Sequence, residues 1–146
     1  MNPFAEKRYV VIVQCHLVAE RCPGYYCERA FHQRVGGFAN YPPNLPNRTL
    51  YLTCGGCCGR ALQRKLSLLA RTLQKKEQIE KPQIAVQLAS CITNDNYHGP
   101  PCPHLDYLKT LIARLGLEAF EGTHISPTTE ERRREGRYAP YVPPGG

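Results

Sequence analysis

The chain has 146 residues, 42% of them hydrophobic, with eight cysteines and a formal net charge of +7. A chain of this length buries a core sufficient for one domain without covalent cross-links. Its apolar stretches fall short of the roughly 18 residues that cross a bilayer, and Tyr9 to Val13 is too short for a signal peptide. We therefore expect a cytoplasmic protein with no membrane partner.

The first third of the chain predicts one strand, one helix and an irregular connection. Tyr9 to Val13 is a continuous run rich in β-branched residues, as in a strand buried on both faces. The segment Tyr26 to Val35 places apolar residues at helical spacing, and the pair Gly36-Gly37 ends it. Three prolines between Asn40 and Asn47 exclude regular structure there.

The next segment predicts a second strand and the longest helix. Thr49 to Thr53 has the composition of a strand. Leucines recurring at i, i+4, i+7 and i+11 predict a helix from Cys57 to about Ile79, which Pro82 closes. Many basic residues between Arg60 and Lys81 alternate with these leucines, as on the solvated face of any amphipathic helix. The positive charge is therefore weak evidence for nucleic acid, which is not the expected partner.

The remainder of the chain predicts a third strand, a third helix and a fourth strand. Ile84 to Leu88 alternates as a strand, and Leu105 to Leu115 carries the apolar stripe of a helix. Leu117 to Phe120 is a brief strand. We place the domain at residues 1–126 and expect residues 127–146, which have few large aliphatic side chains, to form a peripheral or disordered tail.

Strands that alternate with helices predict an α/β fold. Because βαβ crossovers are right-handed, the expected architecture is a three-layer, doubly wound, mostly parallel sheet of about four strands, with helices on both faces. Ligands of such sheets bind outside the carboxyl ends of the strands, where the loops into the helices converge. The position of each cysteine and histidine relative to these strand ends is therefore informative.

The cysteines and most histidines belong to that edge of the predicted sheet. Cys15, His16, Cys54, Cys57, Cys58, Cys91 and His124 follow the four strands, and Cys22, Cys27, His98, Cys102 and His104 lie in loops that enter helices. Scattered cysteines would also fall inside strands and helices. The clustering predicts a site at this edge, and His32 lies on a helix outside it.

Eight cysteines in an unexported chain call for metal ligation or thiol chemistry, because disulfide frameworks belong to small secreted domains. The turn Cys54 to Gly59 supports this, since its glycines let backbone amides point inward and a helix start favours anionic sulfur. The expected metal ligands are Cys15, Cys54, Cys57, Cys91 and Cys102.

Further candidate ligands have competing interpretations. They are Cys22, Cys27, Cys58, His16, His98, His104 and His124. Each histidine is equally a surface or hydrogen-bonded residue. Cys58 is also interpreted as a small apolar residue, because adjacent side chains at a helix start point in different directions. Cys22 and Cys27 are alternatively a second site or a reversible disulfide.

The order of these motifs resembles that of the CGGC domain proteins, named for the motif that here is Cys54-Gly55-Gly56-Cys57. The resemblance covers roughly Tyr9 to Ser126. It includes Val13-Gln14-Cys15, Cys22-Pro23-Gly24 with Cys27, Gly37-Phe38-Ala39, Ser90-Cys91-Ile92, Cys102-Pro103-His104 and Gly122-Thr123-His124. The resemblance implies a domain that binds a metal, zinc foremost, and it implies no particular reaction.

Zinc is the first expectation for the cofactor, because cysteine and histidine form its usual four-coordinate sites. An iron–sulfur cluster is the alternative, since more than four thiols are present, and it would carry a redox or sulfur-transfer role. Ligand type alone does not separate the two.

Two enzyme classes remain as alternatives. Cys54 to Arg60 reads C-x5-R between a strand and a helix, like the phosphate loop of low-molecular-weight phosphatases and arsenate reductases, with Cys54 as nucleophile and Arg60 as anion clamp. Thiol–disulfide exchange through Cys54 and Cys57 is the other, because a redox C-x-x-C commonly opens a helix after a strand.

Overall fold

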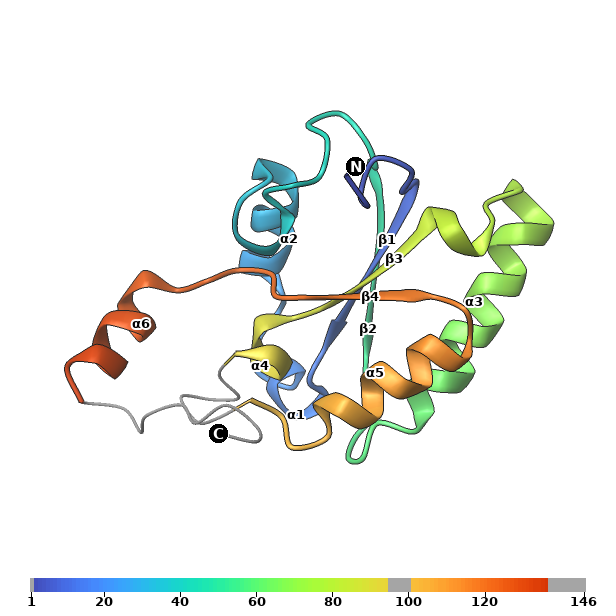
Figure 1. Ribbon diagram of the computed structural model, residues 1–146. Helices are drawn as coiled ribbons and strands as arrows, with labels where there is room; N and C mark the ends of the chain where they lie inside the picture. Colours follow the sequence, from blue (N-terminus) through green and yellow to red (C-terminus); the bar gives the residue numbers. More distant parts are fainter. Residues whose placement is uncertain (1, 95–100, 137–146) are drawn as a thin grey trace.

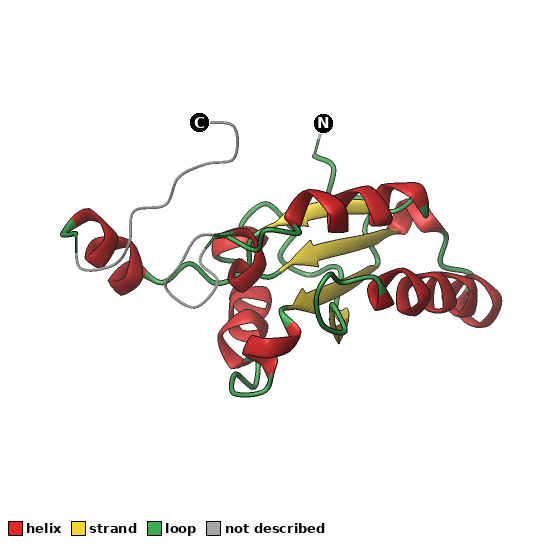
Figure 2. Ribbon diagram, turned by 90° about the horizontal axis from the view of Figure 1, so that it is seen from below, coloured by secondary structure: helices red, strands yellow, loops and turns green. Residues whose placement is uncertain are grey.

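The strands of the computed structural model, which describes residues 2–94 and 101–136, form one sheet. The strands are β1 (Tyr9–Gln14), β2 (Arg48–Thr53), β3 (Ile84–Leu88) and β4 (Glu118–Glu121). All pairings are parallel, in the order β2-β1-β3-β4. Figure 2 shows the strands together as one layer with helices around them.

The helices pack on both faces of this sheet. They are α1 (His16–Ala19), α2 (Tyr25–Gln33), α3 (Ala61–Glu77), α4 (Ser90–Thr93), α5 (Leu105–Arg114) and α6 (Pro127–Arg134), with short 3-10 helices η1 (Gly36–Phe38) and η2 (Lys81–Gln83). Figure 1 shows α3 and α5 on one side of the strands and α2 on the other. The predicted doubly wound α/β class is confirmed, and the sheet is entirely parallel.

Strand β1 carries the core of both layers because it is buried along its whole length. Side chains of a strand alternate between faces. Val11 and Val13 accordingly join the core with Leu62 and Ile112 from α3 and α5, whereas neighbouring β1 residues join Phe31 and Phe38 on the α2 side. Continuous β-branched sequence therefore produced the buried central strand that the pattern predicted.

The longest helix begins later than the leucine pattern predicted. We expected it from Cys57, but α3 begins at Ala61. The cause is the backbone of the preceding turn, where Gly55, Gly56 and Gly59 have φ angles of +80°, +103° and +90°, outside the right-handed helical region. Cys57 and Cys58 are consequently loop residues.

Three short helical elements had no periodic signal. The helices α1 and α4 have four residues each, too few for an amphipathic repeat to be read. The segment after 126 contains α6, which lies apart from the strands in both views (Figures 1 and 2). Within the described part of the chain, no helix has the length and apolarity to cross a membrane.

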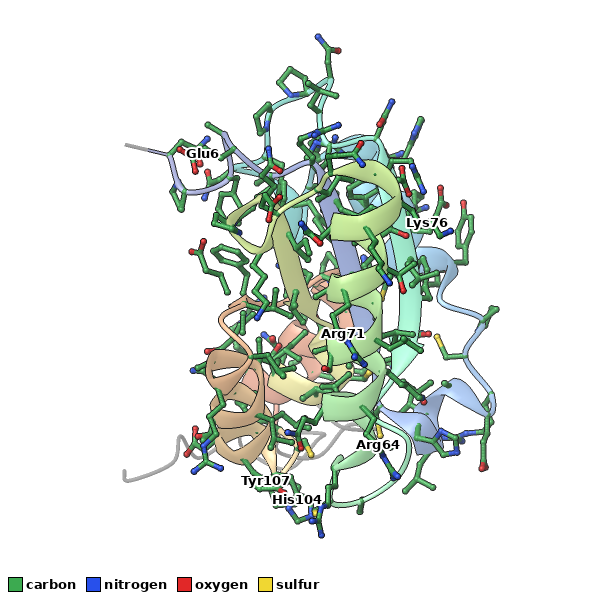
Figure 3. The ribbon with its side chains drawn as sticks, turned by 90° about the vertical axis from the view of Figure 1, so that its right-hand side faces the viewer. Glu6, Arg64, Arg71, Lys76, His104 and Tyr107 are labelled. Carbon is green, nitrogen blue, oxygen red and sulfur yellow. The ribbon has the colours of Figure 1, made fainter. Side chains whose placement is uncertain are left out.

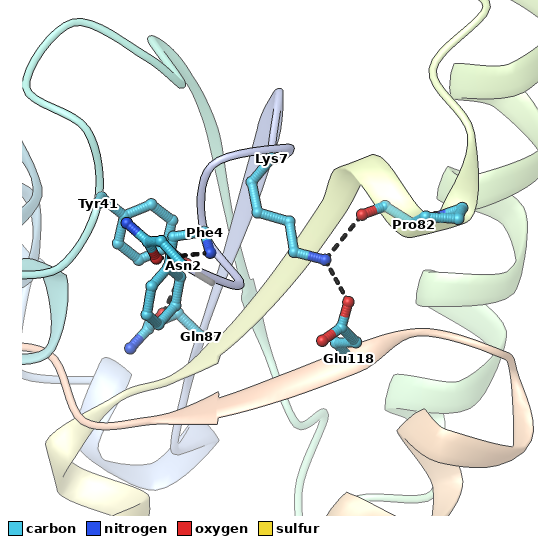
Figure 4. Close-up of polar contacts among 7 residues, drawn as sticks. All are labelled: Asn2, Phe4, Lys7, Tyr41, Pro82, Gln87 and Glu118. Carbon is cyan, nitrogen blue, oxygen red and sulfur yellow. Dashed lines mark hydrogen bonds and ion pairs between the residues drawn. The ribbon is translucent and has the colours of Figure 1, made fainter.

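An ion pair between a buried lysine and a half-exposed glutamate lies at the amino end of the sheet, away from the cysteines. The Lys7 ammonium donates to the carboxylate of Glu118 at 2.6 Å and to the carbonyl of Pro82 at 2.7 Å (Figure 4). The Lys7 side chain is 1% exposed and that of Glu118 is 55% exposed. The buried cation therefore depends on these two oxygen atoms.

We predict that Glu118→Gln lowers the free energy of unfolding by about 2 kcal/mol, because it leaves the buried Lys7 ammonium without its counter-charge. Urea denaturation measures the change. Glu77→Gln is the matched control, since Glu77 pairs with Arg48 in an exposed ion pair and its loss should matter far less. If the two substitutions lowered the free energy of unfolding equally, the buried Lys7 would not depend on the charge of Glu118.

Candidate metal centre

The parallel register brings the strand ends to one level. Gln14 and Thr53 are the last paired residues of β1 and β2, and the Cys54 amide donates to the Gln14 carbonyl at 3.1 Å. On the other side of β1, the Ala89 amide donates to the Val13 carbonyl at 2.9 Å. Cys15 and Cys54 therefore leave adjacent strands side by side, and α4 begins next to them.

The α5-side cavity lies at this edge, on the face covered by α3 and α5. Its lining residues are Cys15, Cys54, Cys57, Cys58, Gly59, Ile92, Cys102, His104 and Leu108. Figure 3 shows His104 at the start of α5, at the same end of the molecule as Arg64 near the start of α3. The cavity volume is about 20 Å³, about the space that one water molecule or one ion occupies.

Cys15 and Cys54 form the buried floor of the α5-side cavity, and each is 7% exposed. They continue the strand positions whose side chains face α3 and α5, and both belong to that core. Cys102 is half-buried before α5, whereas Cys57 and Cys58 are exposed on the turn before α3. The cavity therefore combines a fixed pair of thiols with thiols on a loop.

Backbone amides face several of the sulfur atoms. The His16 amide donates to Cys54 Sγ at 3.4 Å, and the His104 amide donates to Cys102 Sγ at 3.4 Å. Burial raises the pKa of Cys102, and the bond from the His104 amide opposes that rise. Such bonds stabilise thiolate sulfur, the form that ligates metals.

The α2-side cavity lies at the same edge, next to α2 and to the residues that follow β3 and β4. Its lining residues are Gln14, Val18, Cys22, Tyr26, Cys27, Ser90, Cys91, Thr123, His124 and Ser126, and its volume is about 170 Å³. Burial raises the pKa of the Cys91 thiol to about 12 and also raises that of Cys27. Each described cysteine thus lines one of two cavities.

Cys91 lies where the two cavities approach each other. Its Sγ accepts a hydrogen bond of 3.3 Å from the amide of Cys15, although its side chain lines the α2-side cavity. Cys91 also packs against the core on the α3 and α5 side, to which Cys15 and Cys54 belong. It is therefore close to the lining residues of both cavities.

The remaining candidates are placed as follows. His16 is exposed, with Nδ1 3.0 Å from Thr53 Oγ1, and Arg60 is exposed just before α3. His98 lies outside the described residues. Across residues 2–94 and 101–136, no three cysteine, histidine or carboxylate side chains converge closely enough to hold a metal ion as they stand.

Ser90 and Thr123 shape the site and were not expected from the sequence. The Ser90 amide donates to Thr123 Oγ1 at 3.1 Å, and the Thr123 amide donates to Ser90 Oγ at 2.9 Å. This reciprocal pair joins the residues that follow β3 and β4. Serine and threonine are weak signals in a search for soft ligands, although Ser90 precedes Cys91 and Thr123 precedes His124.

The turn after β2 gives limited support to the phosphate-loop interpretation. A phosphate loop directs its amides at the bound anion. Here the Gly55 amide donates to Thr53 Oγ1 at 3.2 Å and the Gly59 amide donates to the Gly56 carbonyl at 2.6 Å. These two amides are used inside the turn, and the bond to Cys54 Sγ comes from another loop.

Comparison with known proteins identifies a family. A family model described as CGGC domain matches residues 9–124. The chain is also 28% identical over 123 residues to the uncharacterized protein MJ0582 of Methanocaldococcus jannaschii, covering 79% of this chain and 85% of that protein. No solved structure matches.

We predict that Gly59→Ala lowers the free energy of unfolding by about 1–3 kcal/mol, because its φ of +90° is unfavourable for alanine and the added Cβ would overlap Leu108. Gly56→Ala is the control, since its φ of +103° carries similar strain but its Cβ would meet open space. Urea denaturation of both variants isolates the overlap. The prediction fails if Gly56→Ala is as destabilising as Gly59→Ala.

Alkylation of the folded, reduced protein should separate the cysteines by environment. We predict that iodoacetamide at pH 8 labels the exposed Cys57 and Cys58 first. Cys91 should react at least about 100-fold more slowly, because burial raises its pKa from 9.0 to about 12 and leaves little of the reactive thiolate. Peptide mass spectrometry over time measures the rates, with the guanidinium-unfolded protein as control. Labelling of folded Cys91 as fast as Cys57 would contradict this environment.

Proposed function

Because the chain belongs to the CGGC domain family, we propose that it is a metal-binding protein whose α5-side cavity takes one soft metal ion, zinc in the first instance. The observation that carries the proposal is the gathering of Cys15, Cys54, Cys57, Cys58, Cys102 and His104 around one cavity. Thiolate and imidazole are the ligands that zinc prefers.

The residues around the α5-side cavity have side chains that bind metal ions, and they come from several parts of the chain. Cys15 and Cys54 are held by the sheet, and amides already face the sulfur atoms of Cys54 and Cys102. The side chains do not converge on one point as they stand in the described part of the chain, so binding requires some of them to turn. Cys57 and Cys58 are exposed on the turn and have the freedom to do so.

Zinc stands first because the α5-side cavity is lined by cysteines and by His104, the residue types of the usual four-coordinate zinc sites. An iron–sulfur cluster, which cysteine thiolates hold, remains the alternative.

We predict that the protein purified without oxygen retains metal, and that Cys54→Ser/Cys102→Ser loses about one equivalent because it removes two thiolate ligands. Elemental analysis measures the metal and an absorption spectrum identifies it, since zinc is colourless and an iron–sulfur cluster is brown. His32→Ser is the matched control, because His32 is an exposed residue of α2 that lines neither cavity.

The proposal is wrong if the folded wild type takes up no zinc or iron, or if the double variant keeps as much metal as the wild type and His32→Ser. Circular dichroism of each variant checks that it folds. Iron with acid-labile sulfide in the wild type would replace zinc by the cluster at the same ligands.

A further inference from the structure

The α2-side cavity brings together soft ligands from four parts of the chain. Cys22 precedes α2, Cys27 lies on α2, Cys91 lies on α4 and His124 follows β4. Their cavity of about 170 Å³ is larger than the α5-side cavity, so its thiols have room to turn toward a common centre. The same residue types that suggest a metal in the first cavity therefore occur again in the second.

Hydrogen bonds hold one wall of this cavity in place. The reciprocal pair of Ser90 and Thr123 sets the positions of the adjacent Cys91 and His124. The Gly37 amide donates to the Thr123 carbonyl at 2.8 Å and ties the same wall to η1. Cys27 Sγ lies 3.2 Å from Thr123 Oγ1. Cys27 thus contacts Thr123 itself, and Cys91 and His124 each follow one residue of the Ser90–Thr123 pair.

Cys22 and Tyr26 form another part of the cavity wall. The Cys22 amide donates to the Val18 carbonyl at 2.8 Å, which anchors the loop between α1 and α2. The Tyr26 ring stacks on His124 with ring centroids 4.8 Å apart, and the Arg29 guanidinium lies over the Tyr26 ring, 5.0 Å from its centroid. Stacking orients the His124 imidazole at the cavity wall.

The thiols of the α2-side cavity are partly shielded from solvent. Cys22, Cys27 and Cys91 are each half-buried, and His124 lines the same cavity. A metal ion bound among them would neutralise the negative charge of the thiolates that ligate it.

The two cavities lie on either side of the end of β1. Gln14 lines the α2-side cavity and the next residue, Cys15, lines the α5-side cavity, as alternation along β1 requires. The Cys15 amide bonded to Cys91 Sγ lies between them. Two groups of ligands separated in this way are suited to two ions rather than one.

We propose that Cys22, Cys27 and Cys91, with His124, form a second binding site for a thiophilic metal ion, separate from the α5-side site. It adds to the proposed function and does not depend on it. The class of ligand is a soft ion such as zinc or cadmium, for which thiolate and imidazole are the preferred donors.

Cadmium titration of the metal-free, reduced protein under anaerobic conditions tests this. Cadmium is the probe because thiolate binding gives it an ultraviolet charge-transfer band. We expect about two equivalents in the wild type and about one in Cys27→Ser/Cys91→Ser, in which two donors of the second site are lost. Cys54→Ser/Cys102→Ser should also bind about one equivalent, at the second site. Circular dichroism confirms that both variants fold, and serine keeps the size of each side chain.

The outcomes separate the two proposals. If cadmium is lost only from Cys54→Ser/Cys102→Ser, the second site is wrong and the α5-side site stands. If neither double variant loses cadmium, both sites are wrong. If cadmium is lost only from Cys27→Ser/Cys91→Ser, the second site stands and the α5-side site is wrong. One wild-type equivalent that both double variants lose would indicate a single shared site and overturn the inference.

Discussion

The hydrogen bonds between β1 and its two neighbours determine where the sulfur atoms of this protein lie. Parallel pairing with β2 and β3 ends all three strands at one level, and the amides of Cys54 and Ala89 extend the pairing past the last strand residues. Residues that are distant in sequence, such as Cys15, Cys54 and Cys91, then emerge together. The packing of a buried central strand is therefore also what assembles the site.

The alternation of side chains along β1 divides what the register brings together. Gln14 and Cys15 are adjacent in sequence but face the α2 layer and the α5 layer, respectively. Each layer contributes its own thiols, from the turn before α3 and the start of α5 on one face and from the start of α2 on the other. The result is two thiol-lined cavities joined by the contact between Cys15 and Cys91.

Much of this arrangement could be predicted from the sequence, because the strongest signals were local. The β-branched run at Tyr9–Val13 and the leucines of α3 identified buried elements, and their order implied the parallel sheet. The start of α3 was predicted wrongly, since positive φ angles at Gly55 and Gly59 are decided by the tight turn and by Leu108 packing against it. The position of Cys91 between the two cavities was not readable, because it depends on the turn into α4.

The contact between η1 and the loop after β4 restricts how this protein can evolve. Added side chains at Gly36 and Gly37 would overlap the carbonyl groups of Thr123 and Gly122, respectively, and the Gly36 φ angle of +59° is itself unfavourable for other residues. Two backbones thus touch where side chains usually intervene. A homologue with a larger residue at either glycine would have to move η1 away from the loop that carries Thr123. Because Thr123 lines the α2-side cavity, such a substitution would change the shape of that cavity without replacing a cysteine.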